Sequence, residues 1–215
     1  MPLIQFNVGG IKKTAFFSFI PKTGGTALIQ AFRALGARIY LHEENNPVVG
    51  VLRCPSQHFH YELSSKIIDI GAANHAFAVI RHPLTRAISD YKWAYRNAKS
   101  STRIPWIDDW LETLLKHYNR NGFIFDNHLR PQTEFVGPQI KAIYRYEDGL
   151  DKALIKTLKA MQLTPTSDTV NIPRENTSSE LMTQLVKKHS KDRLLAAERI
   201  VRKFYAKDYQ RFEYE

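Results

Sequence analysis

The sequence predicts a single α/β domain over residues 1–215, in which a mainly parallel sheet is flanked by helices. Three observations lead to this prediction. The 215 residues are 43% hydrophobic and 24% charged, which is usual for one globular domain. Short apolar runs alternate with segments of helical periodicity, as in strands joined by helices. A glycine-containing loop separates the first apolar run from the first helical segment.

The strands are expected where short apolar runs end in turn signals. Residues 15–20 (Ala-Phe-Phe-Ser-Phe-Ile) and 75–80 (His-Ala-Phe-Ala-Val-Ile) are typical of buried central strands. Pro21 and Pro83 follow these two runs closely. Residues 38–41 and 141–146 are further candidates for strands.

The helices are expected where apolar residues recur at helical spacing. Leu28, Ile29, Phe32 and Leu35 form one such stripe, and a glycine then marks the end of the helix. The second strand is followed by a proline at a favourable first helical position. The expected helices cover 26–35, 84–98, a segment from about residue 105, 148–161, a segment behind a capping box at 177–180, and 194–204.

Composition and charge exclude several classes of protein. A disordered chain, a collagen-like chain and a coiled coil would each have a different composition or repeat. No run of about 18 apolar residues exists, and no signal peptide is visible, so we expect no membrane insertion. Cys54 is the single cysteine, which rules out an internal disulfide and favours a cytoplasmic location. The net charge of +10 favours polyanionic partners such as nucleic acid, anionic polysaccharide or a phosphorylated cofactor.

The loop at 21–26 (Pro-Lys-Thr-Gly-Gly-Thr) lies between a predicted buried strand and a predicted helix. Its glycines let the backbone approach an anion closely, and the start of a helix points free N–H groups at that anion. Lys22 adds a positive charge, and the threonines add hydroxyl donors. Because the lysine precedes the glycines, the loop lacks the Walker A order. A P-loop-like site for a phosphate or a phosphosulfate is therefore predicted here.

A second anion site is predicted after the strand at 75–80. Arg81 ends this strand, and Ser89 lies about two turns into the following helix. The carboxyl ends of strands in an open α/β sheet border the ligand crevice, where an arginine and a hydroxyl can hold a terminal phosphate. A magnesium nucleotide site would need an acidic residue at this strand end. Arg81 in that place predicts phosphate binding without a metal.

The segments 20–26 and 79–91 (Val-Ile-Arg-His-Pro-Leu-Thr-Arg-Ala-Ile-Ser-Asp-Tyr) resemble the two cofactor motifs of sulfotransferases that use PAPS, 3′-phosphoadenosine 5′-phosphosulfate. The chain is most similar to the carbohydrate branch (Golgi-type, uronyl 2-O and chondroitin-like) and its soluble bacterial relatives. His82 is a departure, because this branch often has Asp there. The resemblance implies two sets of cofactor ligands: Lys22, Thr23, Gly24, Gly25 and Thr26 for the 5′-phosphosulfate, and Arg81 and Ser89 for the 3′-phosphate.

The resemblance extends over most of the chain, although only the first two motifs are specific. Residues 127–132 (Asn-His-Leu-Arg-Pro-Gln) are similar to a His-x-Arg-Pro-Gln segment of chondroitin and dermatan sulfotransferases. Residues 146–148 and the aromatic segment 204–212 resemble later parts of the same family. Within the His-x-Arg-Pro-Gln segment, we expect His128 and Arg130 to bind the acceptor substrate.

Sulfuryl transfer needs an acceptor hydroxyl, a base for its proton and cations for the departing phosphate. Lys22 is the expected cation near the bridging oxygen. The His-Phe-His segment at 58–60 is similar to one in uronyl 2-O-sulfotransferases, where a histidine is the base. The resemblance makes His60 the first choice and His58 the second, and alternation along an extended segment would put both on one side. Further candidates for the base are His128, Glu43 and Glu44.

These observations predict a sulfotransferase that moves the sulfuryl group of PAPS to a carbohydrate hydroxyl and releases PAP. A P-loop nucleotide kinase or NTPase is the first alternative, and a basic nucleic-acid-binding protein is the second. The Walker A order and any nucleic-acid-binding signature are both missing. A zinc site at Cys54, His42, His58 and His60 is disfavoured, because the spacing matches no standard pattern. We therefore expect an anionic or neutral carbohydrate partner, no nucleic acid and no metal.

Overall fold

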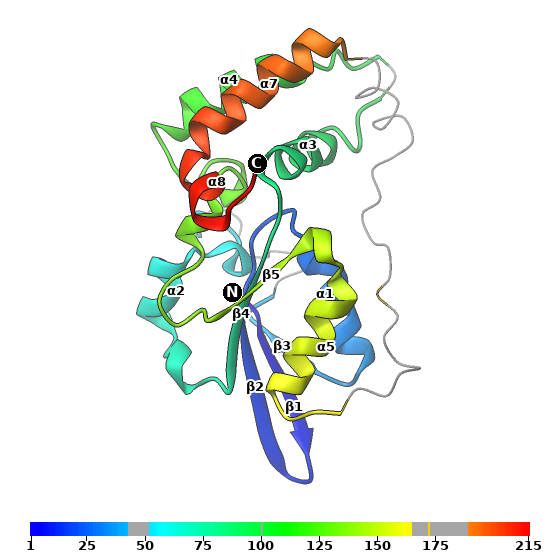
Figure 1. The fold of residues 1–215 in the computed structure, drawn as a ribbon, viewed down its shortest axis with the longest axis vertical. Coiled ribbons are helices and arrows are strands. Elements are labelled where there is room, and N and C mark those ends of the chain that lie inside the picture. Colours follow the sequence, from blue (N-terminus) through cyan, green and yellow to red (C-terminus); the bar gives the residue numbers. More distant parts are fainter. Residues whose placement is uncertain (43–51, 100, 165–171, 173–188) are drawn as a thin grey trace.

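The computed structural model describes residues 1–42, 52–99, 101–164, 172 and 189–215. Its centre is a five-stranded sheet with the strand order β3-β1-β2-β4-β5 (Figure 1). The strands are β1 (Leu3–Val8), β2 (Ile11–Ser18), β3 (Arg38–Tyr40), β4 (His75–Ile80) and β5 (Ala142–Arg145). All four predicted strands are present, and β4 covers the predicted residues.

The sheet is mixed, which corrects the expectation of a mainly parallel one. β4 is parallel to both β2 and β5, whereas β1 is antiparallel to both β2 and β3. β1 and β2 form a hairpin through Gly9 and Gly10, whose φ values of 58° and 83° suit a tight two-residue turn. β1 is absent from the sequence prediction, although Val-Gly-Gly-Ile at 8–11 is a recognisable hairpin signal.

Helices surround the sheet, and five of them stand where helices were predicted. α3 ends at Ala94 rather than at residue 98, and α2 and α8 are additional. The capping box at 177–180 and the helix expected behind it lie outside the described residues. None of the described helices is both long and apolar enough to cross a bilayer. The helices are α1 (Gly25–Ala34), α2 (Tyr61–Ile67), α3 (Pro83–Ala94), α4 (Ile107–Tyr118), α5 (Leu150–Ala160), α7 (Lys191–Phe204) and α8 (Ala206–Phe212).

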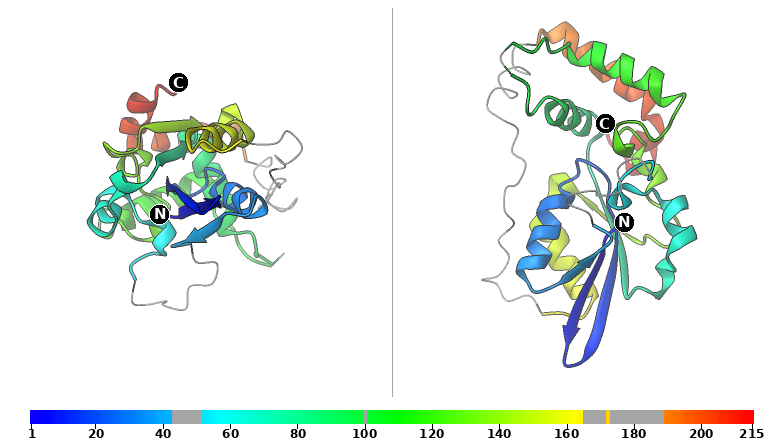
Figure 2. Two further views of the ribbon diagram at one scale, coloured as in Figure 1. Left: turned by 90° about the horizontal axis from the view of Figure 1, so that it is seen from below. Right: turned by 180° about the vertical axis from the view of Figure 1, so that it is seen from behind.

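Each face of the sheet packs against its own helices (Figure 2). α1 and α5 cover one face, where Phe17 of β2 and Phe77 of β4 stack with ring centroids 4.6 Å apart. The other face packs Phe16 against Phe135 and residues of α2. Because successive residues of a strand point to opposite faces, the adjacent phenylalanines of β2 belong to two different clusters. This double burial explains why residues 15–18 of β2 and 76–80 of β4 are mainly apolar without alternation.

A helical layer of α3, α4, α7 and α8 lies beyond the carboxyl ends of β2 and β4 (Figure 1). It has its own apolar cluster, which includes Tyr91, Trp110 and Val201. α3 follows β4 directly, so the second predicted motif connects the sheet to this layer. The edge of the sheet that carries both predicted motifs therefore faces the helical layer.

Candidate active site

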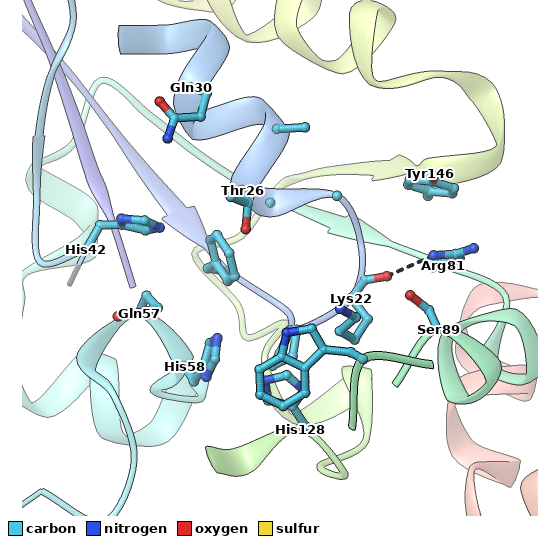
Figure 3. A pocket seen from close by; sticks show the side chains of 16 residues that line it. Lys22, Thr26, Gln30, His42, Gln57, His58, Arg81, Ser89, His128 and Tyr146 are labelled. Carbon is cyan, nitrogen blue, oxygen red and sulfur yellow. Dashed lines mark hydrogen bonds between the residues drawn. The ribbon is translucent and has the colours of Figure 1, made fainter. Parts of the chain in front are cut away.

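A cavity of about 380 Å³ lies at the carboxyl ends of β2 and β4 (Figure 3). One part of its lining, which we call the phosphate-loop wall, consists of Pro21, Lys22, Gly24, Gly25, Thr26 and Ala27. Another part, which we call the histidine wall, consists of Gln57, His58, Trp93 and His128. Arg81, Ser89 and Tyr146 complete the side between the two motifs.

The phosphate-loop wall contains residues with positive φ values, a backbone conformation that favours glycine. Gly24 has a φ of 85° and precedes α1 without a side-chain cap, and Lys22 also has a positive φ of 68°. A Cβ on Gly25 would lie 2.4 Å from the Phe19 ring, so the loop and the ring approach more closely than an alanine allows. The first turn of α1 carries no acidic residue. Its N-terminal N–H groups and positive dipole end are therefore suited to an anion.

Lys22 combines a positive charge with partial burial. Burial lowers its pKa from 10.5 to about 8, the carboxylate of Asp90 counteracts this, and Arg81 and Arg96 lower it further. Its Nζ lies 5.4 Å from the centre of the Trp93 ring. Lys22 is thus held among other cations, an environment that a bound polyanion would stabilise.

The Thr23 side chain, predicted as a cofactor ligand, does not line the cavity. Its Oγ1 donates a hydrogen bond of 2.9 Å to the carbonyl oxygen of Ile20, and the residue is fully buried. This short-range bond fixes the turn of the loop, as threonine hydroxyls commonly do. The other predicted ligands of the loop, which are Lys22, Gly24, Gly25 and Thr26, do line the cavity.

Arg81 and Ser89, the predicted ligands of the second anion site, lie on the same cavity as the loop. Nη1 of Arg81 donates to the carbonyl oxygen of Lys22 at 3.2 Å, and Nε donates to Oγ1 of Thr85 at 3.1 Å. The guanidinium also stacks on Tyr146, with Cζ 4.3 Å from the ring centre. Figure 3 shows Arg81 and Ser89 side by side beyond Lys22. The structure thus brings the two sequence motifs together through Arg81.

His82, which departs from the family pattern, faces away from the cavity. Its Nδ1 accepts a hydrogen bond from the N–H of Leu84 at 3.3 Å and so caps α3. The ring packs edge-on against Tyr209 and Tyr214. An imidazole nitrogen therefore takes the capping role that an Asp oxygen commonly has.

The two imidazoles of the histidine wall, those of His58 and His128, have ring centroids 4.8 Å apart. Nδ1 of His58 lies 3.0 Å from the carbonyl oxygen of Asp126, and Nδ1 of His128 lies 2.6 Å from Oδ1 of Asp90. Both partners are oxygen acceptors, so each neutral ring carries its proton on Nδ1 and its lone pair on Nε2. Burial, reinforced by His128, holds the pKa of His58 well below its usual range.

His60, the first choice for the base, is not in this wall. It precedes α2, and its ring packs against Phe123 with centroids 5.8 Å apart. Burial and Arg130 lower its pKa to about 4. The 3₁₀ helix η1 (Ser56–His58) ends just before it, so the segment lacks the extended alternation that would point both histidines the same way. Only His58 of the pair reaches the cavity.

Arg130 also lies away from the cavity, whereas His128 lines it as predicted. Nε of Arg130 donates to Oδ1 of Asn127 at 2.7 Å, and its guanidinium pairs with Glu134. These contacts hold the Arg130 side chain within one short segment. Glu43 and Glu44 lie outside the described residues.

Several lining residues are absent from the sequence prediction. Trp93 stacks on His128 with centroids 4.8 Å apart, and Arg96 stacks on Trp93 with Cζ 4.0 Å from the ring centre. Trp93 follows Ser89 by four residues, a spacing that places both on one face of α3 and could have identified it. No comparable local signal marks Gln57, because its position depends on contacts between distant segments.

The arrangement supplies cations and helix N–H groups for an anion beside imidazoles that can accept a proton. Among the described residues, no three His, Cys, Asp or Glu side chains are grouped as a metal site. No curated protein and no solved structure gives a significant match to the chain. A family model described as the sulfotransferase family matches residues 12–215, which is nearly the whole chain. The chain therefore belongs to the sulfotransferase family.

Proposed function

We propose that this protein transfers the sulfuryl group of PAPS to a carbohydrate hydroxyl, with a histidine of the cavity as general base. The observation that carries the proposal is that one cavity joins two sets of groups that each suit an anion. Lys22 and the start of α1 form one, and Arg81 and Ser89 form the other. PAPS carries anionic groups at two separate positions, the 5′-phosphosulfate and the 3′-phosphate.

The phosphate-loop wall suits the 5′-phosphosulfate in shape as well as in charge. The absence of a Cβ at Gly24 and Gly25 lets the loop pack closely against Leu150 and Phe19, which holds it in this conformation. The ammonium of Lys22 and the N–H groups of α1 can stabilise the negative charge that develops on the departing phosphate. Such preorganised donors need no rearrangement during the reaction, which is how positioning accelerates group transfer.

The rest of the lining supports a carbohydrate acceptor. Gln30, His42 and Gln57 line the cavity beyond the phosphate loop. Amide and imidazole groups can both donate and accept hydrogen bonds, as recognition of sugar hydroxyls requires. An acceptor such as a phenol would instead favour a mainly apolar lining.

Calorimetry with PAP in EDTA tests the cofactor assignment, with 5′-AMP as the matched ligand that lacks the 3′-phosphate. We expect micromolar binding of PAP and much weaker binding of AMP and of ATP, with or without magnesium. Arg81→Ala should remove about 10- to 100-fold of the preference for PAP over AMP, since it loses charge-assisted hydrogen bonds. A preference for magnesium-ATP would support a nucleotide kinase instead. Steeply salt-dependent binding of generic DNA without PAP binding would support the nucleic-acid alternative.

Transfer of labelled sulfate from PAPS tests the acceptor class. The panel contains uronic-acid polymers, hexosamine polymers, neutral oligosaccharides and simple phenols. We expect label on a saccharide and none on the phenols. Label on phenols alone would contradict the carbohydrate assignment while leaving the PAPS assignment intact.

A further inference from the structure

Asp90 is a buried carboxylate of α3 that contacts the histidine wall from behind. The residue is 2% exposed, and its Oδ1 lies 2.6 Å from Nδ1 of His128. A carboxylate in such a position requires a partner, because an unpaired buried charge is strongly unfavourable. His128 is that partner, and it is itself only 4% exposed.

We propose that Asp90 is a positioning residue that holds His128 with Nε2 toward the cavity, and that His128 rather than His58 accepts the proton of the acceptor hydroxyl. This inference rests on the proposed sulfuryl transfer and names its base. The sequence gives His128 only as one of several further candidates for the base, and it assigns no role to Asp90.

Contacts on several sides fix the His128 ring. Trp93 stacks on it at an interplanar angle of 28°, and Phe125 meets it edge-on with centroids 5.2 Å apart. The carbonyl oxygen of His128 accepts a hydrogen bond from the buried guanidinium of Arg86. With Asp90 on Nδ1, the ring has one orientation and one neutral tautomer. Preorganisation of this kind is what a general base needs.

His58 is the weaker candidate for the base because its Nδ1 contacts a weaker acceptor. A backbone carbonyl accepts from its Nδ1, whereas a full carboxylate accepts from Nδ1 of His128. If His128 takes up a proton, its imidazolium lies beside the negative charge of Asp90. If His58 takes up a proton, its imidazolium lies beside only the dipole of a backbone carbonyl. Burial holds the pKa of His58 well below its usual range, which opposes proton uptake by this ring. His58 is then a neutral neighbour that can orient the acceptor.

The proposed step balances in atoms and charge. The acceptor oxygen forms a bond to sulfur while its proton moves to Nε2 of His128. The bond between sulfur and the bridging oxygen breaks, and its electron pair stays on the phosphate of PAP. The products are the sulfate ester, PAP and an imidazolium, which returns its proton to water.

Asp90 also acts on the phosphate-loop wall. Its charge raises the pKa of Lys22, against burial and the cations Arg81 and Arg96. Loss of this charge therefore shifts the pKa of Lys22 below about 8. This effect on Lys22 is independent of the contact with His128, so kcat and PAP affinity are compared at a pH where Lys22 is protonated, and a fall in kcat at unchanged PAP affinity then reports the positioning of His128.

The test compares Asp90→Asn, His128→Ala and His58→Ala with wild type at pH 6.5, where Lys22 is protonated. Asp192→Asn and His117→Ala are the matched controls, because both residues are exposed on the helical layer. We expect His128→Ala to lower kcat by about 10²–10⁴-fold, the usual range for a general base, with PAP affinity unchanged. Asp90→Asn should lower kcat by a smaller factor and shift the alkaline loss of PAP affinity to lower pH. His58→Ala should lower kcat least of the three.

Added imidazole provides a measurement that remains informative if Asp90→Asn does not fold. It should restore part of the activity of His128→Ala, because the cavity then has room for the free base. Full activity of His128→Ala, or rescue of His58→Ala alone, would overturn the assignment. Failure of wild type to bind PAP would refute the proposed function itself, and the two failures are therefore distinguishable.

Discussion

The phosphate-loop wall and the histidine wall meet in one cavity but are built in different ways. The phosphate-loop wall is one continuous segment, 21–27, whereas the histidine wall combines residues 57, 58, 93 and 128. Backbone shape and the start of α1 define the first wall. The second depends on side chains that are oriented by distant partners, such as Asp126 for His58 and Asp90 for His128.

From this difference we expect cofactor binding and proton transfer to be separable in this protein. Substitutions in the phosphate-loop wall should weaken the binding of PAP and reduce the stabilisation of the charge on the departing phosphate. Changes in the histidine wall should act on kcat while PAP still binds. Arg86 connects the two walls, since Nε donates to the carbonyl oxygen of Pro21 at 3.1 Å and Nη2 donates to that of His128.

The largest effect on activity is expected from Lys22→Ala. Removal of one preorganised donor at a developing negative charge typically lowers kcat by about 10²–10³-fold. PAP affinity should fall as well, because the loop loses its only side-chain cation. Steady-state kinetics and calorimetry measure the two effects, and Lys66→Ala, at an exposed lysine of α2, is the control. Near-normal kcat and PAP affinity in Lys22→Ala would contradict the assignment of this wall.

Arg86→Leu should disturb both walls together. The guanidinium is 2% exposed, and its loss leaves the carbonyl oxygens of Pro21 and His128 without this donor. Each unsatisfied buried acceptor lowers the free energy of unfolding by about 1–3 kcal/mol. Chemical denaturation measures the loss, and Arg202→Leu, at an exposed ion pair with Glu198, is the control. Equal stability of the two variants would show that the walls do not depend on Arg86.

A smaller and more selective effect is expected from Gly25→Ala. The new Cβ would lie 2.4 Å from the Phe19 ring, which also lines the cavity, so either the loop or the ring must move. Overpacking costs about 1–3 kcal/mol, and the Kd for PAP should rise about tenfold. Calorimetry measures the Kd, with Gly71→Ala in the 3₁₀ helix η2 (Ile70–Ala72), where the glycine is exposed, as the control. An unchanged Kd would mean that the loop tolerates a side chain here.

The phosphate-loop wall could be predicted from the sequence because it is local. A buried strand, a Lys-Thr-Gly-Gly segment and a helix start are consecutive, and the anion site follows from their order. Even there, the hydroxyl of Thr23 turns inward to Ile20, because a local hydrogen bond competes with the ligand. The same locality explains why β4 covers the predicted residues and why Arg81, directly after it, lies on the cavity.

The histidine wall could be predicted only in part because its members meet through tertiary contacts. Of two histidines that are two residues apart, only His58 lines the cavity, because a 3₁₀ helix precedes His60. Arg130 belongs to the segment that resembles the family, but its guanidinium contacts Glu134 and Asn127 rather than the cavity. The antiparallel β1 is different, because its pairing with β2 is a local hairpin whose Gly-Gly turn is visible in the sequence.

The smallest effect on activity is expected from His60→Ala, which sharpens the comparison between the two histidines. Its ring lies outside the cavity against Phe123, so kcat should stay within about twofold of wild type, as for substitutions away from a site. His117→Ala is the control. Loss of turnover with intact PAP binding would instead make His60 the base, as the family resemblance implies.

A second readout of the same variant concerns stability. Burial lowers the pKa of His60 from 6.5 to about 4, so between these values the unfolded chain binds a proton that the folded chain does not. Stability contributed by the neutral ring is therefore present above pH 6.5 and is lost as the pH falls toward about 4. His60→Ala should make the unfolding midpoint less dependent on pH over this interval. An unchanged dependence would show that His60 titrates alike in both states, and the ring would then be exposed enough to reach a ligand.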